Sequence, residues 1–248
     1  MQIAIIGDVH GDWDSLNTVI RSIFHHFPET THIVQVGDFG HGWPQVSLTD
    51  PYNLWKIPDA FKRKKRPFHF LDGNHENFEF LKKFGSGSKW LTYQPRGSIL
   101  EIEDKKLMFF GGATSIDKED RIIGRSWWPD ENIKKHELDA AINLDIETVD
   151  AIFSHEHPES IPYRIKSDLP DGYSDRVALD ILYNRFKPKF WFFGHWHKPD
   201  FGIMDDLTWT CCPSINNEKM YVIWDGKQVI PSWTVIKSHK LAYERGLK

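Results

Sequence analysis

Five short clusters of polar residues in this 248-residue sequence carry side chains that bind metal ions in proteins. The clusters are Asp8-Val9-His10, Gly37-Asp38, Gly73-Asn74-His75-Glu76, His155 and Gly194-His195-Trp196-His197. Without His75 and Glu76 they offer two carboxylates, one amide oxygen and four imidazoles, and no thiolate. This is too many ligands for one tetrahedral zinc ion, and it suits two divalent ions that share a bridging carboxylate.

The elements that must position these clusters are apolar runs typical of strands buried on both faces. The runs cover residues 2–6, 32–36, 67–71, 149–153 and 189–193, and a polar cluster follows each of them. Open α/β sheets place their sites at the carboxyl ends of strands, so we expect the clusters to meet there. Residues two apart in an extended segment point to the same side, which predicts that Asp8 converges with His10, and His195 with His197.

Helical patterns separate these strands over residues 13–27, 77–84, 131–144 and 174–186, and this alternation predicts an α/β fold. Residues 98–111 read as a hairpin, and short strands follow at 208–212, 220–224 and 229–236. We therefore expect a second sheet packed on the first. Long loops at 39–58, 113–130 and 156–173 are of the length that is usually functional or disordered.

The order of the five clusters resembles the pattern of the calcineurin-like metallophosphoesterases: Asp-x-His, Gly-Asp, Gly-Asn-His-Asp/Glu, His and Gly-His-x-His. All five blocks occur here between residues 7 and 197. Any one block alone reads better as a polar loop whose histidines are satisfied by hydrogen bonds, but five in this order favour the metal interpretation. The resemblance implies a two-sheet αββα sandwich with two metal ions at the strand ends.

The resemblance also implies a role for each residue of the blocks. The first ion would be held by Asp8, His10 and His197. The second would be held by Asn74, His155 and His195, with Asp38 bridging the two. His75 would be the general acid that protonates the leaving oxygen, and Glu76 would orient its imidazole. A metal-bound hydroxide would attack phosphorus, with manganese the first choice of metal and iron, zinc, nickel or cobalt as alternatives.

One block departs from the branch that it otherwise resembles, the protein phosphatases and dinucleoside tetraphosphatases. That branch continues its second block with Asp-Arg-Gly, whose arginine binds phosphate, whereas this chain continues Phe39-Gly40-His41-Gly42-Trp43-Pro44. A phosphate-binding arginine must then come from elsewhere. Arg121 and Arg125 are the candidates, in a loop similar to one in uncharacterised bacterial and phage members, and surface salt bridges explain them equally well.

The bulk properties exclude several classes of function. A formal charge of −4 does not favour an extended nucleic-acid partner. The first apolar run stops at Gly7, which is too short for a signal peptide or a membrane span, and the adjacent Cys211 and Cys212 give no sign of an oxidising compartment. We expect a cytoplasmic protein without a membrane partner, folded as one domain over residues 1–248. The oligomeric state stays open.

Several weaker signals each have two readings. The basic run Lys62-Arg63-Lys64-Lys65-Arg66 is better explained as a solvated helix end than as a nucleic-acid or nuclear-import signal. His41 and His157 read as loop histidines sooner than as groups that support the site. Four tryptophans in the site-forming loops could stack on a base or an aryl ester or could simply pack at the rim: Trp43, Trp127, Trp128 and Trp196.

The sequence thus predicts a phosphoesterase that acts on small phosphate mono- or diesters, nucleotide-type substrates included. A Ser/Thr protein phosphatase and a dinucleoside polyphosphate hydrolase are the alternatives, and the missing Asp-Arg-Gly weighs mildly against both. A repair-type nuclease usually has an added capping domain, but only short strands follow His197. A non-catalytic scaffold would typically have lost ligands or the acid histidine, and this chain has lost neither.

Overall fold

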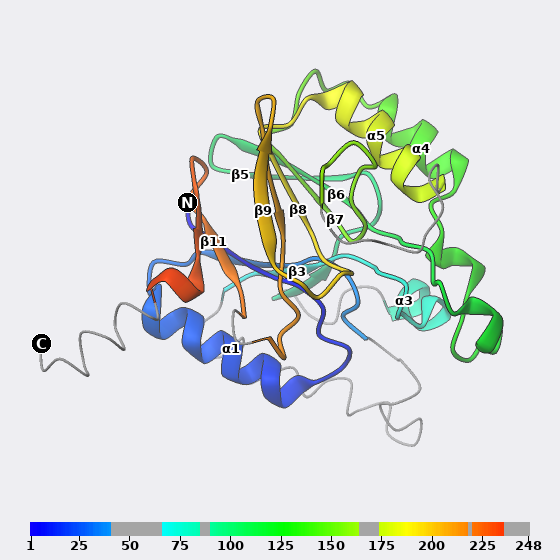
Figure 1. The fold of residues 1–248 in the computed structure, drawn as a ribbon, viewed down its shortest axis with the longest axis horizontal. Coiled ribbons are helices and arrows are strands. Elements are labelled where there is room, and N and C mark those ends of the chain that lie inside the picture. The colour runs from blue at the N-terminus through cyan, green and yellow to red at the C-terminus, as the bar shows by residue number, and fades with distance from the viewer. Residues whose placement is uncertain (41–65, 85–89, 164–173, 218–219, 236–248) are drawn as a thin grey trace, which may run out of the picture.

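Two sheets of six strands each form the centre of the molecule (Figure 1). The structure, a computed structural model, describes residues 1–40, 66–84, 90–163, 174–217 and 220–235. The first sheet has the order β12-β11-β1-β2-β3-β4, with β12 (Val229–Pro231), β11 (Val222–Trp224), β1 (Ile3–Ile6), β2 (His32–Gln35), β3 (Phe68–Phe70) and β4 (Leu91–Tyr93). The second has the order β5-β6-β7-β8-β10-β9, with β5 (Ser98–Ile102), β6 (Lys105–Phe110), β7 (Ala151–Ser154), β8 (Phe190–Phe193), β10 (Leu207–Cys211) and β9 (Asp200–Met204).

Each sheet has a parallel centre. In the first sheet β1 to β4 are parallel, with Ile3 opposite His32 and Ile33 opposite Phe68, and β11 and β12 extend it with antiparallel pairs. In the second sheet β6, β7, β8 and β10 are parallel, and β5 and β9 pair antiparallel at the two edges. The strands that precede the polar clusters are therefore all parallel ones.

Alternate residues of these strands are buried in two different cores, which explains why the strands are predominantly apolar. In β1, Ile3 and Ile5 lie between the two sheets, whereas Ala4 and Ile6 lie under helix α1. In β8, Phe190 and Phe192 take the inner face, and Trp191 and Phe193 the outer one. A strand that is covered on both faces offers polar groups to a site mainly at its ends.

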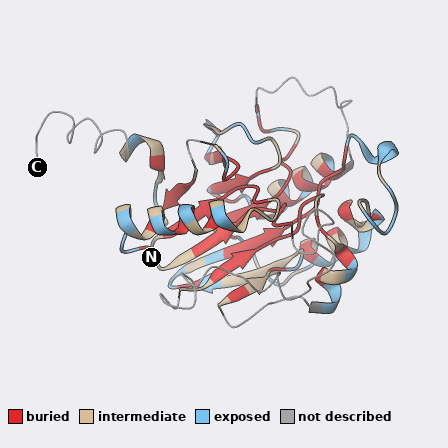
Figure 2. Ribbon diagram, turned by 90° about the horizontal axis from the view of Figure 1, so that it is seen from below, coloured by how far each residue is buried: buried red, intermediate tan, exposed pale blue. Residues whose placement is uncertain are grey.

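Helices cover the outer faces of both sheets (Figures 1 and 2). Helices α1 (Trp13–His26) and α3 (Phe78–Phe84) pack on the first sheet, and α4 (Lys135–Ile142) and α5 (Ser174–Phe186) on the second. Helix α1 begins after Asp12, whose side chain accepts a hydrogen bond from the Ser15 N–H (3.0 Å). The layers follow the order helix, sheet, sheet, helix, and the predicted αββα sandwich is confirmed.

The structure differs from the sequence-based expectation in some elements. The strands β4 and β9 had no prediction, and α4 begins only at Lys135, after the short 3₁₀ helix η3 (Pro129–Glu131). The C-terminal strands do not stay together: β10 joins β8 in the second sheet, while β11 pairs with β1 in the first. His41, Trp43 and Lys62 to Lys65 lie outside the described residues. None of the helices in the described ranges has both the length and the apolar character that a membrane crossing requires.

Candidate metal centre

The five polar clusters meet where the parallel strands of both sheets end. Asp8 and His10 follow β1, Asp38 follows β2, and Asn74, His75 and Glu76 follow β3 of the first sheet. His155 follows β7, and His195 and His197 follow β8 of the second sheet. Three overlapping groups of these side chains bring ligand atoms within 4.8 Å of one another: Asp8 with His10 and His197, His10 with Asp38 and His75, and Asp38 with His155 and His195.

The first group has donor atoms at the separations that one shared ion requires. His197 Nε2 lies 2.8 Å from Asp8 Oδ2 and 3.1 Å from His10 Nε2, and His10 Nε2 lies 3.7 Å from Asp8 Oδ2. Ligands that bind one tetrahedral ion at about 2.1 Å are about 3.4 Å apart. Asp8 is fully buried, whereas the side chain of His197 is 50% exposed, so this group opens toward solvent.

The third group centres on His155, whose tautomer is determined by its surroundings. Its Nδ1–H donates to the Val36 carbonyl (2.8 Å), which leaves the lone pair on Nε2. Nε2 faces Asn74 Oδ1 at 3.2 Å and Asp38 Oδ1 at 3.3 Å, and His155 is fully buried. Three lone-pair atoms that face one another away from water need a cation or a proton between them.

The pKa values of this group express the same requirement. Burial lowers the pKa of His155, but the charge and hydrogen bond of Asp38 overcome it and raise that pKa to about 10. Burial raises the pKa of Asp38, yet the neighbouring His155 and His75 bring it well below its usual range. For His195, burial and the charge of His155 lower the pKa to about 4. A positive charge is thus favoured between Asp38 and His155, whether a proton or a metal ion supplies it.

The backbone at four of the clustered residues has a conformation that L-amino acids rarely adopt. His10, Asp38, His195 and His197 have φ angles of 50°, 55°, 66° and 57°. The expectation that Asp8 with His10, and His195 with His197, converge along extended segments is therefore wrong. Asp8 and His10 do share a ligand group, but His195 and His197 lie in two different groups. Left-handed turns direct the side chains inward, and such strained residues gather at functional sites.

Two glycines make room for the buried side chains of His155 and Asp38. A Cβ atom on Gly37, whose φ is +86°, would overlap the ring of His155, and one on Gly73 would overlap the Asp38 carboxylate. The side chain of Gln35 donates to the carbonyls of Gly7 and Gly37 and so joins the turns after β1 and β2. The glycine that precedes Asp38 and the one that precedes Asn74 are therefore required by close packing.

His75 lies beside the shared carboxylate. Its backbone N–H donates to Asp38 Oδ1 (2.7 Å), and its ring centroid is 5.0 Å from that of His10. Arg121 Nη2 donates to His75 Nε2 (3.1 Å), so this nitrogen carries the lone pair. Burial lowers the pKa of His75, the charge of Asp38 opposes this, and Arg121 lowers it further.

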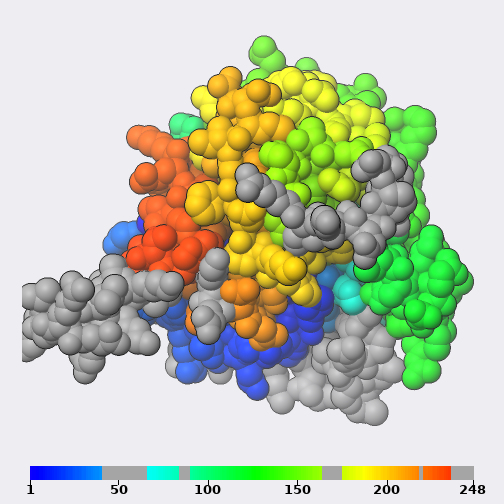
Figure 3. All heavy atoms as spheres, in the orientation of Figure 1, coloured from blue at the N-terminus to red at the C-terminus, as the bar shows by residue number. Residues whose placement is uncertain are grey.

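The two candidate arginines differ in position, although they share one surface loop (Figure 3, green). The side chain of Arg121 is only 9% exposed and also contacts Ser115 Oγ (2.9 Å) and Asp117 (2.6 Å). Arg125 is exposed. Glu76 is fully buried and accepts a hydrogen bond from the Phe39 N–H (2.7 Å). Its predicted role in orienting His75 stays a prediction.

Three buried residues around the site were missed from the sequence. Glu156 accepts from the Trp196 indole N–H (2.9 Å) and lies 3.7 Å from His195 Nε2; its place directly after His155 was a usable signal. Ser115 contacts Asn74, and Glu131 contacts Ser115, but both lie far from the blocks in sequence.

The weaker sequence signals within the described residues have structural explanations. His157 is buried, its Nδ1 bonds to the Pro158 carbonyl (2.7 Å), and it is in none of the three ligand groups. Trp128 is buried in the core under α1 and α3, and Trp196 bonds to Glu156. These contacts favour packing over substrate stacking for Trp128.

A family model described as calcineurin-like phosphoesterase matches residues 1–199. No curated protein matches the chain.

Among solved structures, the protein TT1561 of Thermus thermophilus is similar with a TM-score of 0.62 and 11% identity, covering 92% of this chain and 96% of that one. A dimetal phosphatase from Danio rerio has a TM-score of 0.56 and 14% identity, with coverage of 90% and 91%. GAP50 of Plasmodium, described as the anchor in the inner membrane complex, has 0.51 and 18%, with coverage of 90% and 80%. At these identities the likeness shows the shared fold.

Proposed function

Because the chain belongs to the calcineurin-like phosphoesterase family, we propose that it hydrolyses phosphate mono- or diesters, nucleotide-type esters included, with two divalent metal ions. Members of this family generally bind a dinuclear metal centre, and His/Asp groups of this chain could hold one. The observation that carries the proposal is the convergence of Asn74 Oδ1 and Asp38 Oδ1 on the lone pair of His155 Nε2, at 3.2 and 3.3 Å. This buried arrangement of acceptors fits a cation.

The ligand groups support one assignment of residues to the two ions. We assign the first ion to Asp8, His10 and His197, the second to Asn74, His155 and His195, and Asp38 to both. Nitrogen and oxygen donors without thiolate suit manganese first, with iron, zinc, nickel and cobalt as alternatives. When bound, two such ions supply an activated water at neutral pH and neutralise charge on the phosphoryl oxygens.

His75 is the proposed general acid for the leaving oxygen, with Glu76 behind it. His75 is fixed beside Asp38 by its backbone hydrogen bond, and its Nε2 accepts from Arg121. In this arrangement Nε2 holds no proton. A bound phosphate attracts the Arg121 guanidinium, which frees Nε2 to carry a proton and to donate it to the leaving group.

We propose Arg121, in preference to Arg125, as the arginine that binds phosphate. Its position between Ser115 and His75 supports this choice, and Arg125 is exposed. Arg121→Ala should raise KM by about 10- to 100-fold, as expected when a hydrogen bond to a charged group is lost. Arg125→Ala is the matched control and should leave KM within about twofold. The reverse order of effects would reassign the role.

The first experiment loads the purified protein with manganese, nickel or cobalt and assays bis-p-nitrophenyl phosphate and p-nitrophenyl phosphate. Hydrolysis of either ester supports the proposal. Two bound metal ions without hydrolysis of either ester would contradict it. The kcat/KM values for monoesters, diesters, cyclic nucleotides and dinucleoside polyphosphates then identify the substrate class.

A further inference from the structure

We propose that Ser115 and Glu131 form a clamp that positions the metal ligand Asn74 and the phosphate-binding Arg121 together. The inference rests on the proposed function, because it concerns the residues that support that site. It identifies two positioning residues outside the five sequence blocks. Ser115 is 2% exposed and Glu131 is fully buried.

Ser115 uses every hydrogen bond that its hydroxyl group can make. Its Oγ lies 3.1 Å from Asn74 Nδ2, 2.9 Å from Arg121 Nη1 and 2.7 Å from Glu131 Oε2. An amide NH₂ and a guanidinium can only donate, so Oγ accepts from both. The hydroxyl proton must then go to Glu131, and the backbone N–H of Ser115 donates to the other oxygen of the same carboxylate (2.8 Å).

The clamp decides which atom of the Asn74 amide faces the metal centre. Because Nδ2 donates to Ser115, Oδ1 is directed at His155 Nε2, 3.2 Å away. A flipped amide would present hydrogens where a ligand oxygen is needed. Groups that orient metal ligands in this way usually contribute about 10- to 100-fold to metal affinity.

The same hydroxyl also fixes the inner edge of Arg121. With Nη1 held by Ser115, Nη2 reaches His75 Nε2 at 3.1 Å. The Glu131 carboxylate lies directly behind Ser115, so its negative charge favours the guanidinium at this place. One serine therefore connects a ligand of the second ion with the side chain that binds the substrate phosphate.

Glu131 is itself anchored to the segment that carries Asn74. Arg96 Nη2 donates to the Glu131 carbonyl (3.0 Å), and the same guanidinium binds Asp72, two residues before Asn74, at 2.7 and 3.0 Å. The Ala113 N–H also donates to the Glu131 carbonyl (3.1 Å). Both ends of the loop over residues 113–131 are thus fixed to the site, and a rigid support of this kind is what a positioning role requires.

The test measures Mn²⁺ binding by calorimetry and steady-state kinetics on the better p-nitrophenyl ester. Ser115→Ala should weaken the second Mn²⁺ by about 10- to 100-fold, leave the first within about threefold, and raise KM. Glu131→Gln should act in the same direction with a smaller effect. Ser126→Ala removes a hydroxyl from the same loop, one that accepts from the Ile122 N–H, and should change neither property.

A double-mutant cycle separates positioning from general damage to the loop. Ser115→Ala in the Arg121→Ala background should raise KM much less than in the wild type, because the arginine that it positions is gone, while the loss of the second Mn²⁺ persists. Wild-type affinities and KM in Ser115→Ala would overturn the clamp, as would additive KM effects. If circular dichroism shows that Ser115→Ala does not fold, the same measurements of Mn²⁺ affinity and KM on Glu131→Gln test the clamp instead. A wild type that binds no metal and cleaves no ester would instead refute the proposed function.

Discussion

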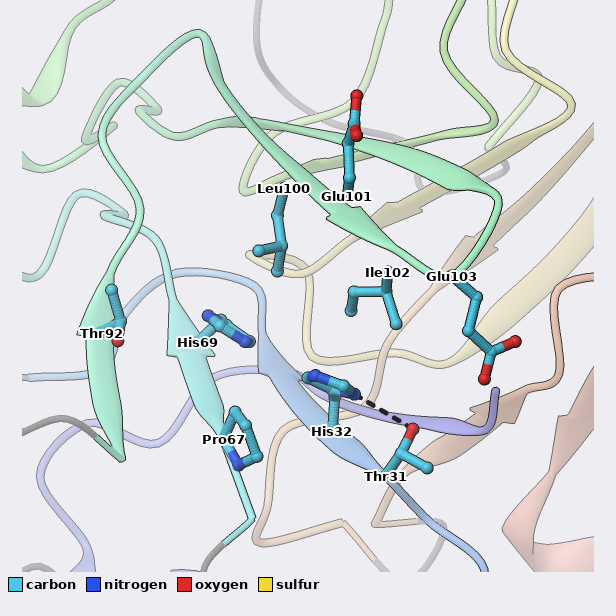
Figure 4. Close-up of a pocket in the computed structure, with 9 residues that line it drawn as sticks. All are labelled: Thr31, His32, Pro67, His69, Thr92, Leu100, Glu101, Ile102 and Glu103. Atoms are coloured by element: carbon cyan, nitrogen blue, oxygen red, sulfur yellow. Dashed lines mark hydrogen bonds between the residues drawn. The ribbon is translucent and has the colours of Figure 1, made fainter.

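Two groups of histidines lie near opposite ends of the parallel strands of the first sheet and differ in nearly every property that matters for chemistry. One is the site cluster after the strand ends. The other is His32, which begins β2, and His69 in β3, whose rings stack at 5.8 Å. These two line a cavity of about 540 Å³ together with Thr31, Pro67, Thr92 and residues 100–103 of β5 and its turn (Figure 4).

The comparison shows that burial alone does not decide what a histidine does. His155 and His69 are both buried, yet burial with the neighbouring His32 lowers the pKa of His69 to about 4, whereas Asp38 raises that of His155 to about 10. His69 Nδ1 faces the Gln94 amide (3.0 Å), a neutral partner. Backbone geometry differs as well, since His69 lies in a regular strand, whereas His10, Asp38, His195 and His197 of the site have left-handed backbone conformations. A buried carboxylate and a strained turn mark the site.

The sharpest test of this contrast removes the shared carboxylate. Asp38→Ala should lose both metal ions and reduce kcat/KM by about 1000-fold or more, because Asp38 is the carboxylate assigned to both ions. His69→Asn, at the other end of the strands, should keep both metal ions and its activity. Metal content by mass spectrometry and kcat/KM provide the comparison. Two retained ions in Asp38→Ala would contradict the bridging role.

The next effect concerns the acid. His75→Ala should keep both metal ions and lose about 10²- to 10⁴-fold in kcat, with the larger losses on esters of poor leaving groups. The measurement is kcat over a series of aryl esters of rising phenol pKa. Equal losses along the series would exclude His75 as the proton donor. His157→Ala is a useful control, because that imidazole lies outside the ligand groups.

Metal removal should lower the stability of the folded protein through the site cluster and not through His32 and His69. An ion present at about a thousand times its Kd stabilises the folded state by about 4 kcal/mol, so a chelator should lower Tm in the wild type and in His69→Asn alike. Asp38→Ala should be insensitive to the chelator. Thermal unfolding with and without EDTA checks this, and a chelator effect that His69→Asn abolishes would break the comparison.

The smallest predicted effect is a dependence of stability on pH that comes from His69, far from the site cluster. Because the pKa of His69 lies near 4 in the folded protein and near 6.5 otherwise, protons favour the unfolded chain. This contribution to stability is complete above pH 6.5 and is lost as the pH falls toward 4; between pH 7 and 5 the loss is about 2 kcal/mol. Urea unfolding at pH 7 and at pH 5 should show that the free energy of unfolding falls by about 2 kcal/mol less in His69→Phe than in the wild type. An unchanged pH dependence in the variant would refute it.

The sequence could predict those features that leave a signal in a short, continuous stretch of residues. A strand covered on both faces must be mostly apolar, so β1, β2, β3, β7 and β8 and the polar residues after them were recognisable. In strand β4 only Leu91 is buried, and β9 is an edge strand that exposes Phe201 and Ile203, so neither has the pattern of a buried strand.

The geometry of the site was harder to predict from the sequence than the residues that form it. The left-handed turns at His10 and His197 depend on the packing of both sheets, and no residue type there requires them. Ser115 and Glu131 come close to Asn74 only because of the path of a long loop. They lie 41 residues or more from Asn74 in the sequence, and no helix or strand periodicity relates residues at such separations. Contacts of this kind are created by the tertiary structure.

The proposed metal ligands come from both sheets, which has a consequence for how the protein assembles. Asp8 and His10 come from one layer and His197 from the other, and Asn74 and His155 are divided in the same way. With these proposed ligands neither layer alone completes a coordination sphere, so we expect high-affinity metal uptake only after the inner core between the layers has formed. During refolding, the appearance of tightly bound metal would therefore mark the moment at which the two halves have come together.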